Sequence, residues 1–177
     1  MAKDPKVFQE FPYFLTLTVV GWTDFFIRQE YRQQIFENLR FCQENKGLEV
    51  YCYCLMTSHL HLIASGRDLP INEIMRSLKS FSGKFLLRTM RDNPQESRKP
   101  WLESRFKYLA NIRAKDTETQ FWERDNYPEA ILTDAFFRQK QNYIHQNPVV
   151  AGFVTRPEDW YYSSACPEGP LRIVPFD

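Results

Sequence analysis

The chain has 177 residues, of which 43% are hydrophobic and 16% aromatic, and its formal net charge at pH 7 is +1. This composition predicts a single domain over residues 1–177 with an apolar core, and it excludes an intrinsically disordered chain. No run of about 18 apolar residues is present, so we expect no membrane-spanning helix.

The N-terminal segment is polar and does not resemble a signal peptide. Residues 1–11 contain Lys3, Asp4, Lys6 and Glu10 and have no continuous apolar stretch. We therefore expect a cytoplasmic protein whose four cysteines are reduced thiols.

The first third of the chain predicts a strand, a helix and two more strands. Residues 13–20 are rich in β-branched and aromatic residues, which is typical of a strand. A helix should follow and end at Gly47, because apolar residues recur there at helical spacing: Tyr31, Ile35, Leu39 and Cys42. Strands are predicted over 48–56 and 58–65, with a tight turn between them.

A second long helix is expected after Asp68, which would be its N-cap, with Pro70 in the first turn. Its apolar stripe comprises Ile71, Ile74, Leu78, Phe81 and Phe85. A polar break over 93–100 precedes a short helix, and 119–123 is the candidate fourth strand. Residues 125–128 read as a loop.

The last predicted helix begins near Thr133 and ends at Gln146 or Asn147, because proline disfavours helical conformation in the residue before it. Residues 152–177, which contain several prolines, are expected to form an irregular tail. The order of elements predicts an α+β sandwich of the split βαβ (ferredoxin-like) type. Its antiparallel sheet would have helices on one face, and the added C-terminal helix would cover the other.

Positive charge is concentrated in one part of the chain. Residues 74–115 contain eleven basic and three acidic side chains, a local excess of eight positive charges. Aromatic residues are interleaved with them, which is typical of a surface that follows nucleic-acid phosphates. A solvated pair of basic helices would have the same composition, so charge alone leaves both interpretations open.

Two of the three histidines occur as His59-Leu60-His61 in a predicted strand. Side chains alternate along a strand, so both imidazoles should lie on one face, within reach of a single metal ion. Two ordinary strand histidines are the simpler alternative. A structural zinc site formed with Cys52 and Cys54 is a further one, but Cys-x-Cys is poor zinc-site spacing.

The last predicted helix has Tyr143 and Asn147 four residues apart, so these side chains share one face, and Lys140 joins them. This arrangement would present a nucleophilic hydroxyl beside an amide metal ligand, whereas His145 should point elsewhere. Taken alone, the segment is better explained by a surface tyrosine before a helix-ending Asn-Pro.

These segments together resemble the HUH single-tyrosine transposases, and most closely the REP-associated tyrosine transposase family. Residues 53–63 are similar to that family's metal-binding strand pair, and residues 143–154, YIHQNPVVAGFV, to its tyrosine helix and the segment after it. Phe121-Trp122-Glu123 and residues 159–164 also resemble family landmarks. The likeness extends over about 13–165.

The resemblance implies a transposase that cleaves and rejoins single-stranded DNA through a covalent 5′-phosphotyrosine at hairpin-flanked sites. Tyr143 would be the nucleophile, and Mg²⁺ or Mn²⁺ would be held by His59, His61 and Asn147. Candidates for phosphate or DNA contacts are Lys140, Arg76, Lys79, Lys84 and Arg88. A homodimer is compatible with this reading.

Two departures from the family pattern stand out: Thr57-Ser58 replaces the usual Pro-Asn before the first histidine, and Val150 replaces a basic residue. Other functions remain open. A domesticated protein that only binds DNA hairpins would have the same fold. An RNA-recognition sheet is disfavoured, because histidines occupy the strand where its basic and aromatic signature would stand.

Overall fold

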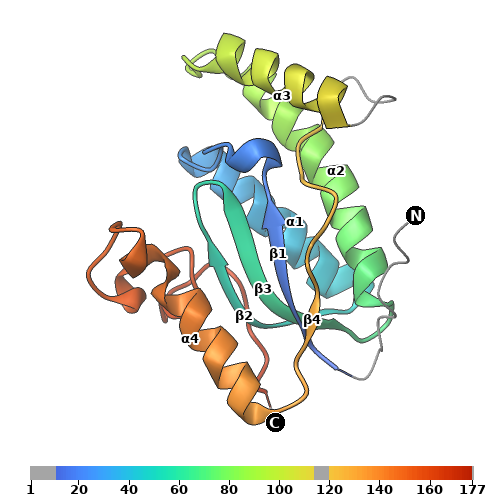
Figure 1. The fold of residues 1–177 in the computed structure, drawn as a ribbon, viewed down its shortest axis with the longest axis vertical. Helices are drawn as coiled ribbons and strands as arrows, with labels where there is room; N and C mark the ends of the chain where they lie inside the picture. The colour runs from blue at the N-terminus through green and yellow to red at the C-terminus, as the bar shows by residue number, and fades with distance from the viewer. Residues whose placement is uncertain (1–10, 114–119, 177) are drawn as a thin grey trace.

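The computed structural model describes residues 11–113 and 120–176. One long helix follows the first strand, a second follows the hairpin of the next two strands, and a third lies near the C-terminus (Figure 1). In chain order the elements are β1 (Tyr13–Thr18), the 3₁₀ turn η1 (Val20–Trp22), α1 (Gln29–Lys46), β2 (Leu48–Leu55), β3 (His59–Gly66), α2 (Ile71–Asp92), α3 (Lys99–Arg113), β4 (Glu129–Ala130), α4 (Asp134–Val150) and the 3₁₀ turn η2 (Pro157–Asp159).

The strands form one antiparallel sheet in the order β2-β3-β1-β4. In the β1–β3 pairing Thr16 lies opposite His61, and Thr18 lies opposite His59. Helices α1 and α2 cover one face, whereas α4 packs on β2 and β3 from the other (Figure 1). The predicted α+β fold with a helix on the second face is therefore confirmed.

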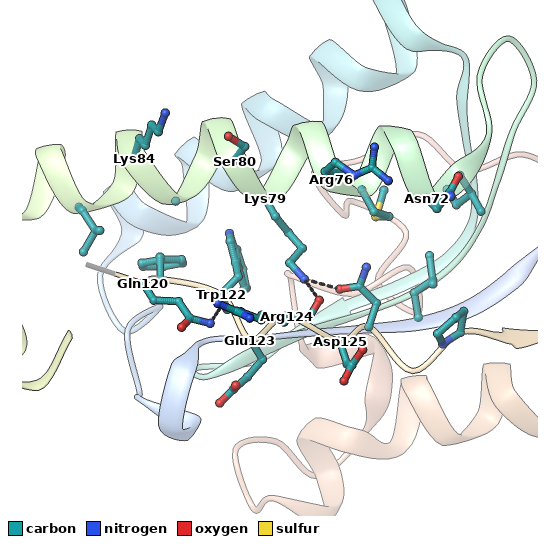
Figure 2. Close-up of a pocket in the computed structure, with 18 of the residues that line it drawn as sticks. Asn72, Arg76, Lys79, Ser80, Lys84, Gln120, Trp122, Glu123, Arg124 and Asp125 are labelled. Carbon is teal, nitrogen blue, oxygen red and sulfur yellow. Dashed lines mark hydrogen bonds between the residues drawn. The ribbon is translucent and has the colours of Figure 1, made fainter. Parts of the chain in front are cut away.

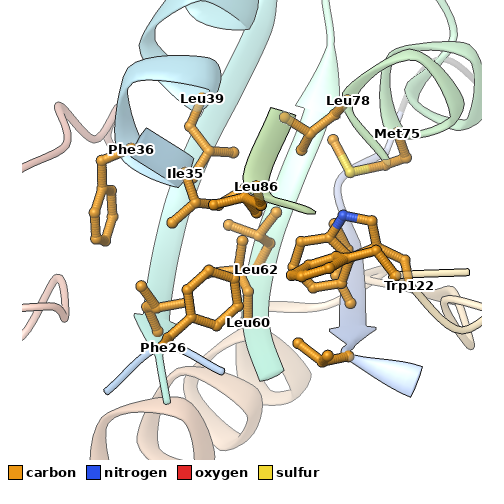
Figure 3. Packing of buried hydrophobic residues seen from close by; sticks show 14 of the residues in the cluster. Phe26, Ile35, Phe36, Leu39, Leu60, Leu62, Met75, Leu78, Leu86 and Trp122 are labelled. Atoms are coloured by element: carbon orange, nitrogen blue, oxygen red, sulfur yellow. The ribbon is translucent and has the colours of Figure 1, made fainter. Parts of the chain in front are cut away.

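Alternation along the strands divides the apolar residues between two cores. Leu60 and Leu62 of β3 point into the larger core beneath α1 and α2, together with Ile35, Leu39 and Leu78 (Figure 3). The smaller core lies beneath α4 and comprises Phe14, Cys52, Cys54, Met56, Ile63, Ile131, Phe137 and Ile144. Since both sheet faces are largely apolar, polar side chains within the α4 face need a specific explanation.

Two local predictions were wrong. The N-cap residue of α2 is Pro70, not Asp68, whose carboxylate instead accepts two hydrogen bonds from Arg67. The fourth strand is β4 and not 119–123, where Thr119 is outside the described residues and Trp122 makes only an isolated bridge to Val19. A strand of two residues has too little alternation to be recognised in a sequence.

Helix α4 does not end before Pro148, as predicted, but continues through it to Val150. The helix ends in a Schellman motif, in which the N–H of Gly152 donates to Val149 O and that of Phe153 to Pro148 O. Gly152 has φ +76°, a conformation that favours glycine. Asn147 therefore lies inside the last turns of the helix and is not its cap.

The C-terminal segment lacks regular structure but is tied to the open edge of β2. Ser164 N donates to Tyr53 O, Leu55 N donates to Tyr162 O, and Val174 N donates to Val50 O. These bonds satisfy backbone groups that an uncovered edge strand would expose. None of the helices in the described segments is long and apolar enough to cross a membrane.

Candidate active site

His59 and His61 lie at the start of β3 on the face that α4 covers. Their ring centroids are 4.6 Å apart, while Leu60 between them is buried in the opposite core. The alternation predicted for this strand therefore brings the two imidazoles together. His61 is only 4% exposed, so a buried polar ring is held in largely apolar surroundings.

Each imidazole is oriented by a hydroxyl at its Nδ1 atom. Thr16 Oγ1 lies 2.9 Å from Nδ1 of His61, and Ser58 Oγ lies 3.1 Å from Nδ1 of His59. The buried Nε2 of His61 has no hydrogen-bond partner within residues 11–113 and 120–176. A hydrogen bond at one ring nitrogen fixes which of the two nitrogens is available to a metal.

Both histidines are neutral at pH 7. Burial, together with smaller contributions from the nearby His59 and Lys140, lowers the pKa of His61 to about 3. Burial also lowers the pKa of His59, against the opposing effect of the nearby Asn147 side chain. Neutral imidazole is the form that binds metal ions.

Helix α4 brings Tyr143 and Asn147 to the histidine pair. The ring centroid of Tyr143 lies 5.3 Å from that of His61 and 5.9 Å from that of Phe14. One turn later, the Asn147 side chain lies close enough to His59 to raise the pKa of that imidazole. Tyr143 is nevertheless 51% exposed, so its hydroxyl is accessible to a large substrate.

The donor set fits a divalent metal ion. In the described part of the chain, no three His, Cys, Asp and Glu side chains are arranged to hold a metal, so a third ligand from these residues would be of another type. The Asn147 amide, which lies beside His59, would supply such a donor. Two imidazoles and one amide oxygen are compatible with Mn²⁺ or Mg²⁺ and would leave coordination positions for phosphate oxygens.

The cysteine alternative finds no support in the described residues, because Cys52 and Cys54 form no such cluster with the histidines. Both thiols are buried, and burial raises the pKa of each to about 12. His145 points toward Cys52 and away from the Tyr143 face, as predicted. Its Nε2 lies 3.3 Å from Cys52 Sγ and 2.9 Å from Ser164 Oγ.

Lys140 lies near the site, but its charge is partly neutralised. Its Nζ donates to Glu129 Oε1 at 2.6 Å and lies 4.2 Å from the centre of the Phe14 ring. Together with its effect on the pKa of His61, these contacts place the ammonium group beside the site.

The other four candidate DNA contacts lie on α2, beside an open cleft of about 670 Å³ between this helix and residues 120–128. Lys79 is turned inward, where it donates to Arg124 O and Asn126 Oδ1 (Figure 2). Burial lowers its pKa to about 8. Arg88 is exposed and pairs with Asp92 at 3.5 Å. Arg76 and Lys84 line the cleft and, within the described segments, have no ion-pair partner.

Sequence reasoning missed the residues that orient the two imidazoles. Thr16 belongs to another strand, and only the β1–β3 register places it opposite His61. Ser58 was noted solely as a departure from the family pattern. A hydroxyl residue directly before His59 was a usable signal for Ser58, but the sequence contains none for Thr16.

Comparisons with known proteins identify the family and the fold of the chain. The sequence model described as transposase IS200 like matches residues 19–109. A relative from Haemophilus influenzae, named as a REP-associated tyrosine transposase, is 26% identical over 167 residues, which cover 93% of this chain and 85% of that protein. A solved structure of a REP-associated tyrosine transposase bound to a REP hairpin superposes with a TM-score of 0.62 at 16% identity, covering 93% of this chain and 82% of that one. Since the matched family segment includes just over half of the 177 residues, the chain belongs to the family of IS200-like transposases.

Proposed function

We propose that the protein is a metal-dependent transposase that cleaves and rejoins single-stranded DNA at hairpin-flanked sites. The observation that carries this proposal is the position of α4: it sets Tyr143 beside His61 and Asn147 against His59. The relative whose structure was solved with a REP hairpin supports a hairpin-bearing substrate. A divalent ion bound by His59, His61 and Asn147 would polarise a phosphoryl oxygen and orient the phosphate.

In the proposed reaction, the hydroxyl oxygen of Tyr143 attacks the scissile phosphorus. A bond forms between the tyrosine oxygen and phosphorus, and the bond to the 3′ oxygen breaks, so that the leaving strand takes up a proton as a 3′ hydroxyl. The 5′ phosphate stays attached to the tyrosine. Because one phosphoester bond replaces another, a second 3′ hydroxyl can reverse the step and join a new strand without ATP.

A hairpin-binding protein without catalysis is the alternative function. The exposed Tyr143 beside two oriented, neutral imidazoles favours catalysis, since hairpin binding requires none of these features. Tyr143→Phe removes one oxygen and separates the two functions. We expect the variant to bind a hairpin oligonucleotide like the wild type but to form no covalent DNA adduct on a denaturing gel in Mn²⁺.

Tyr161→Phe is a matched control, because Tyr161 is similarly exposed but belongs to the C-terminal segment. It should form the adduct at the wild-type rate. An adduct formed by Tyr143→Phe would show that another tyrosine is the nucleophile. A wild-type protein that binds the hairpin and cuts none of its flanking strands in Mn²⁺ or Mg²⁺ would favour the alternative function.

A further inference from the structure

An exposed indole stands next to the histidine pair. Trp22, in the η1 turn after β1, has its ring centroid 5.3 Å from that of His59, at an interplanar angle of 69°. The residue is 63% exposed, whereas Trp122 is buried in the larger core. A large apolar ring that the protein leaves uncovered beside its candidate catalytic site is available to contact a substrate.

The backbone holds this ring in an unusual conformation. Trp22 has φ +54° and follows Gly21 at φ +64°, so two successive residues adopt the left-handed region. Only glycine enters this region easily, and a bulky residue is found there when its surroundings impose it.

Four hydrogen bonds hold the turn. Gly21 N donates to Glu123 Oε1, and Arg105 Nη2 donates to Gly21 O. Thr23 Oγ1 donates to Val20 O, and the N–H of Trp22 donates to Val19 O. The position of the indole is therefore set by three separate segments of the chain, and little rearrangement is needed when a substrate arrives.

The ligand that fits this ring is a nucleobase. A DNA strand whose phosphate occupies the site of His59 and His61 carries its adjoining sugar and base at the rim of that site, where Trp22 lies. Every base has an apolar π-face, and stacking on aromatic side chains is the usual way in which unpaired bases are bound. Phe14 and the buried apolar residues beneath α4 offer no comparable exposed surface.

We propose that Trp22 is a stacking site for the unpaired base adjoining the phosphate held at His59 and His61. This inference rests on the proposed function, because it assumes that single-stranded DNA reaches the histidine pair. In this role Trp22 positions the scissile phosphate. It contributes to binding of the single-stranded segment and not of the hairpin.

The test compares a blunt hairpin oligonucleotide with the same hairpin carrying a single-stranded tail, in the full-length protein. Binding is measured by fluorescence anisotropy in EDTA, so that cleavage does not interfere. We expect Trp22→Ala to weaken binding of the tailed hairpin by roughly tenfold and to leave the blunt hairpin unaffected. Trp22→Phe should retain most of the tail affinity. Phe41→Ala, which removes an exposed aromatic ring from α1, should change neither.

An abasic scan of the tail then locates the base. One abasic position should weaken wild-type binding as much as Trp22→Ala does, and the two changes together should cause no further loss. Tail binding should also quench intrinsic fluorescence in the wild type, and less so in Trp22→Phe. Equal weakening of tailed and blunt hairpins by Trp22→Ala, or additive effects at every abasic position, would overturn the proposal. Because no arm requires cleavage, a protein that stacks the tail on Trp22 but cuts no DNA would refute the proposed function alone.

Discussion

Thr16 and His61 face each other across the β1–β3 pairing, and the threonine hydroxyl lies 2.9 Å from the imidazole Nδ1. This contact leaves the buried Nε2 of His61 as the only ring nitrogen directed to a potential ligand. Hydrogen bonds of this kind set the orientation and basicity of metal-binding histidines.

We therefore expect Thr16→Val to weaken metal binding although it removes no metal ligand. The Mn²⁺ concentration that gives half-maximal cleavage should rise roughly tenfold or more, as is usual when a hydrogen-bond partner of a ligand is lost. Thr16→Ser retains the hydroxyl and is the matched control, with near-wild-type metal dependence. Unchanged Mn²⁺ dependence in a stable Thr16→Val protein would contradict the orienting role.

Part of this site could be predicted from the sequence because it depends on local periodicity. Alternation along one strand places His59 and His61 on a common face, and the helical repeat places Tyr143 and Asn147 one turn apart. These relationships hold wherever the strand and helix are packed. The family resemblance then indicated that the two pairs belong to one site.

Other parts depend on contacts between distant segments, which a single sequence does not encode visibly. The Thr16–His61 contact requires the β1–β3 register, and the inward turn of Lys79 requires Asn126. The wrong prediction that α4 ends before Pro148 had a different cause. The local rule for residues before proline is a preference, and the packing of Ile144 and Pro148 in the protein interior together with the Gly152 cap outweighs it.

Histidine titration should make the metal-free protein less stable in mild acid. The pKa of His61 is lowered to about 3, so between this value and about 6.5 the unfolded chain binds a proton that the folded protein does not. The stability that neutral His61 contributes is complete above about pH 6.5 and is lost as the pH falls. His59 and His145, whose pKa values are also lowered, act in the same direction.

Urea unfolding in EDTA at pH 7.5, 6.5 and 5.5 measures this effect. We expect little change in the free energy of unfolding between the first two values, and then a decrease of about 1 kcal/mol or more by pH 5.5. His145→Gln should reduce the decrease without removing it. A free energy of unfolding that stays constant down to pH 5.5 would show that the folded histidines titrate normally.

Arg76 and Lys84 line the cleft without an ion-pair partner in the described segments, and they should contribute to DNA affinity through phosphate contacts. Replacing Arg76 and Lys84 together by glutamine should weaken hairpin binding and reduce its salt dependence. For single-stranded contacts, each lost phosphate interaction lowers the log–log slope of affinity against salt by about 0.7. Arg156→Gln is the control, since Arg156 is paired with Asp159 in the C-terminal segment.

Lys79→Met should behave differently from the Arg76 and Lys84 changes. Because Lys79 is bonded to Arg124 O and Asn126 Oδ1, its loss should lower the thermal unfolding midpoint more than the salt slope. Binding titrations between 50 and 300 mM NaCl, together with unfolding curves, measure both quantities. A full change of slope in Lys79→Met, without loss of stability, would place a phosphate on Lys79 and contradict its structural role.

Asn147 provides the most direct test of the proposed metal site. Its position beside His59 is consistent with a third ligand, and its place inside α4 excludes the simpler role of a helix cap. We expect Asn147→Ala to raise the Mn²⁺ requirement for cleavage by more than tenfold, because the loss of a ligand should cost at least as much as the loss of a ligand's hydrogen-bond partner. Asn147→Asp keeps an oxygen donor at the same position and should retain activity. Its added negative charge should also lower the Mn²⁺ concentration needed.

Isothermal titration with Mn²⁺ in the absence of DNA separates metal binding from catalysis, because both variants leave Tyr143 unchanged. If Asn147→Ala binds Mn²⁺ as tightly as the wild type while cleavage falls, Asn147 instead positions His59 or the DNA, and the metal ion is held by the two histidines and the phosphate.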